Sequence, residues 1–212
     1  MAKEENKEKQ ITIQEATDIP VDFHSFADKK AFERCISCNT YLQEANTEYL
    51  IEKAVRRYPG FDTHDVIFEY AMCLSCAGRM RQELSASSLR NIENFFEQRV
   101  DLYGRRQEML YEYGLDHEAW LDRCIVTGKP KSELEEYQIY GHCLGNRFLF
   151  SYMPYMISHE AMDEMSDLLS EKTRGEIDRF VDDNFGLPPE LKQPIKDHPV
   201  LLLWTESILQ RG

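Results

Sequence analysis

The sequence predicts an α+β protein made of two small units, each a β-hairpin followed by a helix, with additional helices packed against them. Three observations predict this fold. Two Cys-x-x-Cys pairs flank a predicted hairpin, apolar residues recur at helical spacing over much of the remaining chain, and short segments of the first half recur in the same order in the second half. We expect the first unit to hold a metal ion and the second, degenerate unit to be metal-free.

The first unit is predicted to span residues 11–114, after a disordered tail at residues 1–10. Alternating apolar residues predict strands at 48–56 and 65–72, joined by a turn around Pro59-Gly60. A short helix is predicted at 76–84. An apolar stripe with a 3.6-residue period predicts one long helix over 88–113, which Ser88 opens and Gly114 ends.

The second unit, with the C-terminal helices, is predicted to span residues 115–212. One or two helical turns are expected at 117–123, and Ser158 is expected to cap a helix that reaches about residue 169. Thr173 opens a further helix through a capping box, and the glycine and prolines at 186–189 end it. A last helix is predicted at 199–209.

Four cysteines are the candidate metal ligands: Cys35, Cys38, Cys73 and Cys76, two Cys-x-x-Cys pairs with 34 residues between them. Zn²⁺ prefers such thiolates in a closed tetrahedron, and the hairpin between the pairs would bring them together. The second pair precedes a helix start, which favours thiolate charge. We expect one structural zinc ion. The alternatives are ordinary buried cysteines and a redox pair, which needs a βαβ setting absent here.

This order of a cysteine turn, a β-hairpin and a helix resembles the treble-clef and zinc-ribbon-like group of zinc-binding folds. In that group the first turn of the helix supplies the last two ligands. The resemblance covers residues 32–84, under a third of the chain. It implies a fold and a metal, and it implies no particular function.

The second half carries what we interpret as a degenerate copy of this unit. Residues 33–36 match 122–125, residues 70–74 match 140–144, and residues 84–85 with the helix after them match 169–170 with theirs. In this alignment Cys124 and Cys143 keep two ligand positions, whereas Thr127 and Asn146 stand at the other two.

The two remaining cysteines are expected to be buried free thiols. The alternative is a second metal site formed by Cys124, Cys143 and His142, for which His117 and His159 are further candidate ligands.

Composition and charge limit the possible partners. The chain has 25 basic and 38 acidic side chains and a net charge of −13. Such a surface repels phosphate backbones and anionic lipid, which favours a protein partner over nucleic acid and disfavours a membrane. No apolar run approaches the roughly 20 residues that span a bilayer. The Lys/Glu-rich start does not resemble a secretory signal, so we expect a cytoplasmic protein with reduced cysteines.

No spacing of nucleophilic, acidic or histidine side chains predicts a catalytic site. The aromatic and Met-rich run at 148–156 is expected in the core, with an exposed partner-binding surface as the alternative. The densest basic spots, at 53–57 and 105–106, are expected to be solvated faces.

We therefore expect a non-enzymatic protein-interaction or adaptor protein. One alternative is a nucleic-acid-associated regulator, since zinc folds of this group often serve there. The other is an enzyme whose cleft lies between the two units, near Tyr140 and His142.

Overall fold

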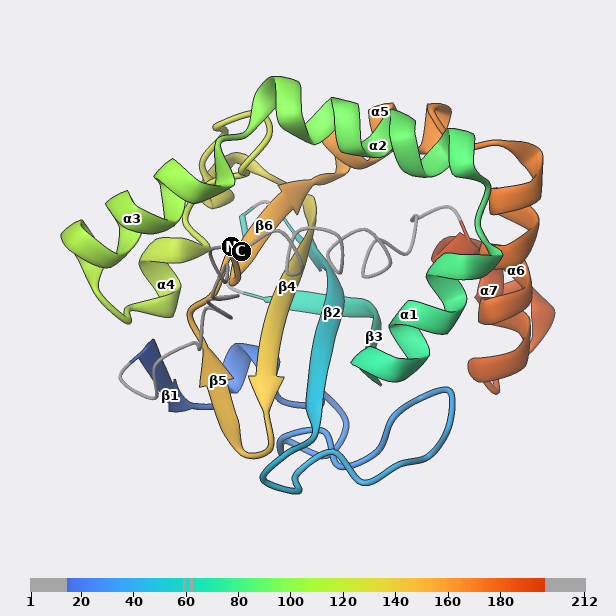
Figure 1. Cartoon of the computed structure of the whole chain (residues 1–212), viewed down its shortest axis with the longest axis horizontal. Helices are drawn as coiled ribbons and strands as arrows, with labels where there is room; N and C mark the ends of the chain where they lie inside the picture. Colours follow the sequence, from blue (N-terminus) through green and yellow to red (C-terminus); the bar gives the residue numbers. More distant parts are fainter. Residues whose placement is uncertain (1–14, 59, 62, 197–212) are drawn as a thin grey trace, which may run out of the picture.

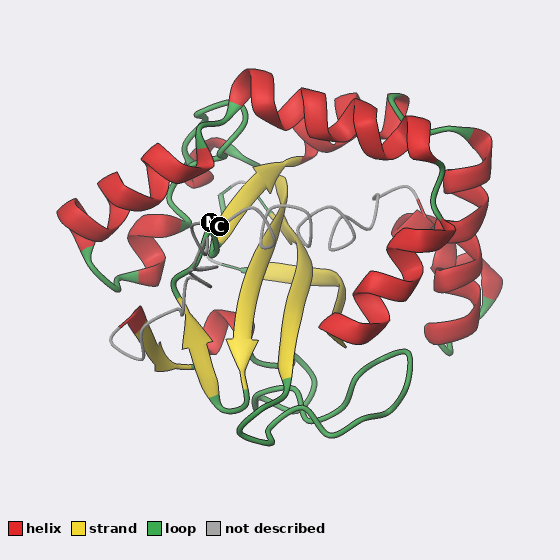
Figure 2. Cartoon of the chain, in the orientation of Figure 1, coloured by secondary structure: helices red, strands yellow, loops and turns green. Residues whose placement is uncertain are grey.

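An antiparallel six-stranded sheet forms the centre of the computed structural model, with helices around it (Figures 1 and 2). The structure describes residues 15–58, 60–61 and 63–196. The strand order is β1-β5-β4-β2-β3, and β6 pairs with the same edge of β4 as β5 does. The strands are β1 (Ala16–Asp18), β2 (Glu48–Arg57), β3 (His64–Cys73), β4 (Glu136–Leu144), β5 (Arg147–Leu149) and β6 (Tyr155–Ser158). The predicted α+β class is confirmed.

Strands β2 and β3 form the predicted hairpin, and each is slightly longer than expected. Tyr49 of β2 pairs with Cys73 of β3, which places the second cysteine pair where the hairpin ends. The turn contains Gly60 with a φ of 86°, a conformation that favours glycine. Strand β2 is central, between β3 and β4, and its residues from Tyr49 to Val55 are buried.

The helices occur largely where the apolar periodicity predicts them. A helix after the second cysteine pair, a short helix near residue 117, a helix capped by Ser158 and a helix after residue 170 are all present. Their bounds are α1 (Leu74–Glu83), α2 (Ala86–Arg99), α3 (Leu102–Tyr113), α4 (His117–Trp120), α5 (His159–Asp167), α6 (Glu171–Asn184) and α7 (Pro189–Lys196), with 3-10 turns at Val21–Phe23 and Lys131–Glu133.

The predicted single helix over 88–113 is wrong, because the chain breaks between α2 and α3. Val100 is extended with a φ of −135°, and the Asp101 side chain accepts a hydrogen bond of 2.9 Å from the Gly104 N–H. Asp101 therefore caps a new helix instead of continuing the old one. Gly114 ends α3 with a φ of 57°, as predicted.

Two helix starts also differ from the expectation. Ser85 and Ser170 are the N-caps of α2 and α6, whereas Ser88 and Thr173 lie in the first turns and donate their backbone N–H groups to those caps. The prolines at 188–189 do not only end α6, because Pro189 begins α7, where its missing N–H costs nothing. The predicted tail at 1–10 and the last helix at 199–209 lie outside the described residues.

The two faces of the sheet are covered by different parts of the chain. On one face, the Tyr70 ring contacts Phe180 of α6 and the Tyr140 hydroxyl lies 3.7 Å from the Met162 sulfur of α5. On the other face, Phe23 packs against Phe148 with 4.6 Å between ring centroids. A Cβ at Gly141 would lie 2.7 Å from the Phe23 ring, so only glycine fits below it.

The aromatic and Met-rich run at 148–156 belongs to the core, as expected. Phe148, Phe150 and Met156 have no exposed surface, and Met153 and Tyr155 are almost fully buried. The alternative, an exposed partner-binding surface on this run, is therefore wrong.

Candidate metal centre

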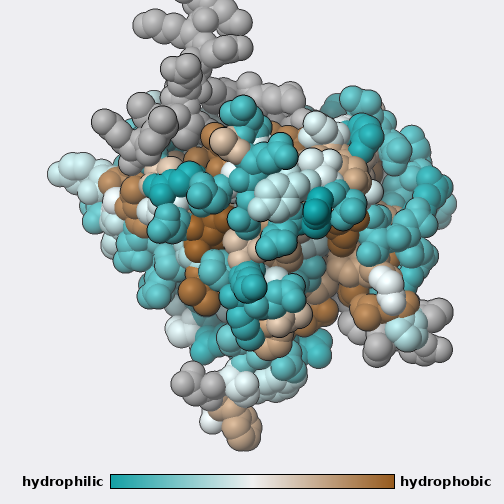
Figure 3. All heavy atoms as spheres, turned by 90° about the horizontal axis from the view of Figure 1, so that it is seen from below, coloured by the Kyte–Doolittle hydropathy of each residue, from teal (hydrophilic) through white to brown (hydrophobic). Residues whose placement is uncertain are grey.

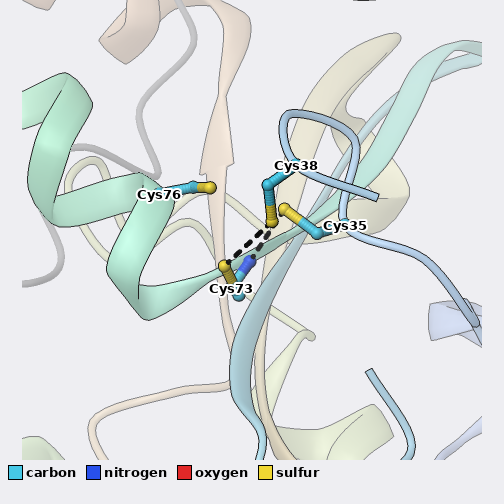
Figure 4. A group of neighbouring side chains, drawn as sticks. All are labelled: Cys35, Cys38, Cys73 and Cys76. Carbon is cyan, nitrogen blue, oxygen red and sulfur yellow. Dashed lines mark hydrogen bonds between the residues drawn. The ribbon is translucent and has the colours of Figure 1, made fainter. Parts of the chain in front are cut away.

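The four cysteines of the two Cys-x-x-Cys pairs converge on one point. Their sulfur atoms all lie within 4.8 Å of one another, and Figure 4 shows them pointing toward a common centre. The Cys38 and Cys73 sulfurs are 3.8 Å apart. A tetrahedral ion with metal–sulfur bonds of about 2.3 Å has sulfur–sulfur edges of about 3.8 Å, so the cluster has the dimensions of a four-sulfur metal site.

A tight turn of the chain positions the first two cysteines. The Cys35 N–H donates to the Thr40 carbonyl and the Asn39 N–H donates to the Cys35 carbonyl, both at 2.9 Å. Asn39 has a φ of 59°, a left-handed conformation that asparagine tolerates. The Ile36 N–H donates to Ala71 of β3, which holds the turn against the hairpin.

The end of the hairpin positions the other two cysteines. Cys73 is the last residue of β3 and the N-cap of α1, and Cys76 lies in the first turn of that helix. The Cys73 N–H points at the Cys35 sulfur at 3.5 Å, and the Arg79 guanidinium donates to the Cys76 sulfur at 2.8 Å. Both groups favour negative charge on sulfur, as does the helix N-terminus.

The thiols differ in their ease of ionisation. Burial opposes ionisation of Cys38, but hydrogen bonding to Thr40 and to neighbouring thiols lowers its pKa to about 6. Burial raises the pKa of Cys73, and burial together with the neighbouring thiols raises that of Cys76 despite Arg79. Four thiolates this close repel one another, so full ionisation calls for a cation at their centre.

The donor set determines what such a site can do. Four sulfurs suit a soft or borderline divalent ion and leave no coordination position for water or substrate. Cys35, Cys73 and Cys76 are buried and Cys38 is exposed. Because the first pair precedes the hairpin and the second pair follows it, an ion bound here would join the chain segments before and after the hairpin. An ion held here stabilises the fold and takes no part in substrate chemistry.

The turn around Cys124 repeats the turn around Cys35, hydrogen bond for hydrogen bond. The Cys124 N–H donates to the Lys129 carbonyl, the Gly128 N–H to the Cys124 carbonyl, and the Ile125 N–H to the Met156 carbonyl of β6. The donors in the first turn are Cys35, Asn39 and Ile36, each the same number of residues earlier in the chain. Gly128 has a φ of 71° and its counterpart Asn39 has a φ of 59°, so both turns place a left-handed residue at this position. The Ser158 N–H points at the Cys124 sulfur at 3.2 Å, as Cys73 does at Cys35.

This recurrence corrects the alignment made from the sequence. Ser158, and not Cys143, takes the position of Cys73, because β6 and not β4 is the strand that leads into the helix. The position of Cys76 is then taken by Ala161, and not by Asn146. Ser85 and Ser170 are separated by the same number of residues as Phe95 and Phe180. Applied to Cys73, that separation gives Ser158, so the sequence did hold a signal for the correct alignment.

The alternative of a second metal site at Cys124, Cys143 and His142 is not supported by the described residues. Within the described part of the chain, the four-cysteine group is the one cluster of three or more potential ligands with metal-binding spacing. His142 is fully buried, and its ring nitrogens lie 2.9 Å from the Ser151 hydroxyl and 2.6 Å from the Glu48 carboxylate. Cys143 is buried opposite Tyr49 of β2, while His117 and His159 lie near Asp22 and Asp163.

The sequence analysis did not anticipate Arg79, which lies three residues after Cys76 and so on the same side of α1. In comparisons with models of protein families, with curated proteins and with solved structures, nothing matches this chain. Among the helices of the described residues, none combines the length and the apolar character needed to cross a membrane.

Proposed function

We propose that this chain is a zinc-stabilised, non-enzymatic protein-interaction protein with two treble-clef-like units, the second of which holds no metal. The observation that carries the proposal is the four-sulfur cluster, which joins a turn, a hairpin and a helix start in one closed site. Such a site serves stability, so the function lies on a surface. None of the six cysteines, all of which lie in the described part of the chain, forms a disulfide, which suits a reducing compartment such as the cytoplasm.

The treble-clef assignment is supported by the order of the parts. A cysteine turn, the β2–β3 hairpin and helix α1 follow one another, and α1 carries the last ligand in its first turn. The turn around Cys124, strands β4 and β6 and helix α5 repeat that order. Thr127, Ser158 and Ala161 stand where the first unit has cysteines, and three such residues leave Cys124 without partner thiolates.

Helix α3 is the surface that we propose for the interaction. All of its residues are described, and none is fully buried. Tyr103, Tyr111 and Tyr113 are 56%, 89% and 51% exposed. Tyrosine is enriched at the energetic centres of interfaces. The net charge of −13 favours a partner with a basic surface. The face of the molecule drawn in Figure 3 is mostly hydrophilic, with small, separate hydrophobic areas.

The same helix is held by its arginines. Arg105 donates to the Trp120 carbonyl at 2.8 Å, and Arg106 donates to the Phe150 carbonyl at 3.3 Å. These guanidinium groups face the protein and not the solvent, contrary to the expectation of a solvated basic face. Burial lowers the pKa of Arg105 to about 10.

The two alternative functions have less support. A nucleic-acid-associated regulator would need basic side chains that are free to bind phosphates. Arg56 pairs with Glu136 and Lys53 pairs with Glu69, and the arginines of α3 bind carbonyl groups of the protein. An enzyme with its reactive groups at Tyr140 and His142 would need access to them, and both side chains have no exposed surface.

Metal content tests the first half of the proposal. We expect one zinc per chain of the wild type by elemental analysis. Cys76→Ala should weaken binding and unfold the first unit, because an open three-thiolate shell loses part of the folding free energy that the metal supplies. Cys143→Ala is the matched control: metal content should not change, and a small cavity should cost about 1 kcal/mol of the free energy of unfolding. A wild type that is metal-free and fully folded in strong chelator would refute the zinc assignment.

Partner capture tests the second half. Immobilised wild-type protein, a Tyr103→Ser/Tyr111→Ser/Tyr113→Ser variant and a Tyr41→Ser/Tyr58→Ser control should be compared against the same lysate. We expect a basic protein that the wild type and the control retain and the triple variant loses, with all three equally folded by circular dichroism. Equal capture by the triple variant would refute the α3 surface. Turnover of a metabolite without any specific protein partner would refute the non-enzymatic role.

A further inference from the structure

A pocket of about 550 Å³ lies on the face of the sheet away from α5 and α6. It is lined by strands β2, β3 and β4, by the segment from Val21 to Lys29 and by the 3-10 turn at Lys131. Neither the metal centre nor helix α3 contributes to it. The volume falls in the range of small-molecule sites.

The floor of the pocket is apolar and consists of neighbours across three strands. Val55 of β2 pairs with Val66 of β3 on one side and with Tyr137 of β4 on the other, and Ile139 lies two residues further along β4. Val55, Tyr137 and Ile139 are nearly fully buried. The central sheet therefore supplies an apolar surface for a ring or chain.

One wall is held by a nearly buried ion pair. The Lys53 ammonium lies 3.1 Å from the Glu69 carboxylate, with side chains 7% and 15% exposed. Lys53 also donates to the His24 carbonyl at 2.6 Å, and Glu69 accepts from the Phe26 N–H at 2.6 Å. Both ends of the pair thus tie the 21–29 segment to the sheet, so the wall is built into the fold.

The charge of the lining is opposite to that of the whole chain. Acidic residues outnumber basic ones 38 to 25 in the sequence, yet the lining has four cations and two carboxylates. The carboxylates, Asp22 and Asp122, have His117 and Arg123 beside them. The cations are Lys29, Lys53, Arg57 and Lys131.

Three of these cations keep their charge for a ligand, and one of them, Arg57, also donates to the Lys131 carbonyl at 2.9 Å. Among the described residues, no carboxylate lies within ion-pair distance of Lys29, Arg57 or Lys131. The Lys29 and Lys131 ammonium groups lie over the rings of Phe26 and Tyr137, at 3.6 Å and 5.6 Å from the centroids. Lys29 has a φ of 56°, a conformation that residues with a side chain rarely adopt and that is concentrated at binding sites.

We propose that this pocket binds a small organic anion: a phosphate or carboxylate group attached to a flat apolar body. The valine, tyrosine and isoleucine floor would take the apolar body, and Lys29, Arg57 and Lys131 would take the charge. Inorganic phosphate alone would leave the floor uncovered, and a neutral ring would leave the cations without a partner.

Naphthyl phosphate is the probe for this class, with naphthol and inorganic phosphate as its two separate parts. In calorimetric titrations of the full chain, we expect naphthyl phosphate to bind at least about tenfold more tightly than either part, as charge-assisted hydrogen bonds add to apolar contact. Binding should weaken as salt increases, and amide NMR signals of Val55 and Val66 should shift.

The variant Lys29→Gln/Lys131→Gln removes two cations that form no ion pair with a described carboxylate and whose ammonium groups contact only aromatic rings. It should weaken naphthyl phosphate binding about tenfold or more and leave naphthol unaffected. Lys30→Gln/Lys172→Gln removes two exposed lysines outside the lining and should bind like the wild type. Thermal unfolding of each variant checks that it is folded. Arg57→Gln, which also loses the hydrogen bond to the Lys131 carbonyl, should weaken naphthyl phosphate binding in the same direction.

Four results would overturn the proposal. Equal affinity for naphthol would reveal an unspecific apolar hollow, and equal affinity for inorganic phosphate would reveal only a basic spot. Equal weakening by the Lys30→Gln/Lys172→Gln control would show a general charge effect. Absence of binding at millimolar probe would show that the pocket has no such ligand class.

Discussion

Two of the fully buried polar side chains, His142 and Glu52, have hydrogen-bond partners on other parts of the chain. His142 has no exposed surface, but both ring nitrogens have partners, in Ser151 and Glu48. Glu52, equally buried, accepts a hydrogen bond of 2.5 Å from the Tyr70 hydroxyl and lies 3.4 Å from that of Tyr140. Because an unpaired buried polar group costs about 1–3 kcal/mol, removing one member of such a set destabilises the fold.

The contact between Glu48 and His142 should make stability depend on pH. The hydrogen bond from His142 lowers the pKa of Glu48 below its ordinary value of 4.5, against the effect of burial. A carboxyl with a lowered folded-state pKa contributes stability above its unfolded value and loses it as the pH falls through the folded value. Wild type should therefore be more stable than Glu48→Gln at pH 6, and the difference should shrink below about pH 4.5.

Chemical denaturation from pH 6 to pH 3 measures this difference, and metal loss at low pH affects both proteins alike. Glu112→Gln, on the exposed side of α3, controls for the loss of one negative charge. A gap between wild type and Glu48→Gln that widens toward pH 3 would contradict the assignment.

At the scale of elements, helices α2 and α6 cap each other. In a capping box, the third residue of a helix bonds back to its own N-cap. Here the Thr173 hydroxyl accepts from the Ser85 N–H at 3.1 Å, and the Ser88 hydroxyl accepts from the Ser170 N–H at 2.8 Å. Each helix thus satisfies a backbone donor of the other.

We expect Ser85→Ala and Ser170→Ala each to lower the free energy of unfolding by about 1 kcal/mol, as loss of an N-cap does. Because the Ser170 hydroxyl donates to the Ser85 hydroxyl at 2.8 Å, the double variant should be non-additive by about 0.5 kcal/mol or more. Urea denaturation of the four proteins of this cycle measures both quantities, with the exposed Ser132→Ala as control. Strict additivity would show that the two caps act independently.

At the scale of the molecule, the two halves meet about a local two-fold arrangement. Strands β2 and β4 pair antiparallel, with Glu52 opposite Tyr140, and carry β3 and β6 on their outer edges. The reciprocal capping of α2 and α6 has the same symmetry. Strands from both halves therefore form one sheet, and neither half has a complete sheet of its own (Figure 1).

If the second unit has lost a metal site, three substitutions should restore it. We expect Thr127→Cys/Ser158→Cys/Ala161→Cys to gather three new thiolates around Cys124 and to bind a second zinc, raising metal content from one to two per chain. The same triple variant with Cys124→Ala is the control and should bind less tightly, because its second shell has only three thiolates. Elemental analysis and cobalt spectroscopy measure the change. A folded triple variant with one metal would contradict the equivalence of the two sites.

The sequence by itself determined the local features of this protein. The period of apolar residues predicted β2, β3 and most helices, and the spacing of the two Cys-x-x-Cys pairs predicted that Cys35, Cys38, Cys73 and Cys76 would meet. Both signals act over a few residues or through one hairpin, where chain geometry leaves few alternatives.

Only the tertiary structure decided the rest. The break at Asp101 depends on a cap that competes with a continuing helix, and the pairing of β2 with β4 depends on strands far apart in the chain. The contact between Ser158 and Cys124 depends on the pairing of β6 with β4, and the pocket beside Val55 combines β2, β3 and β4 with distant segments. Strand pairing is non-local and its register is set by burial on both faces, which no single segment encodes.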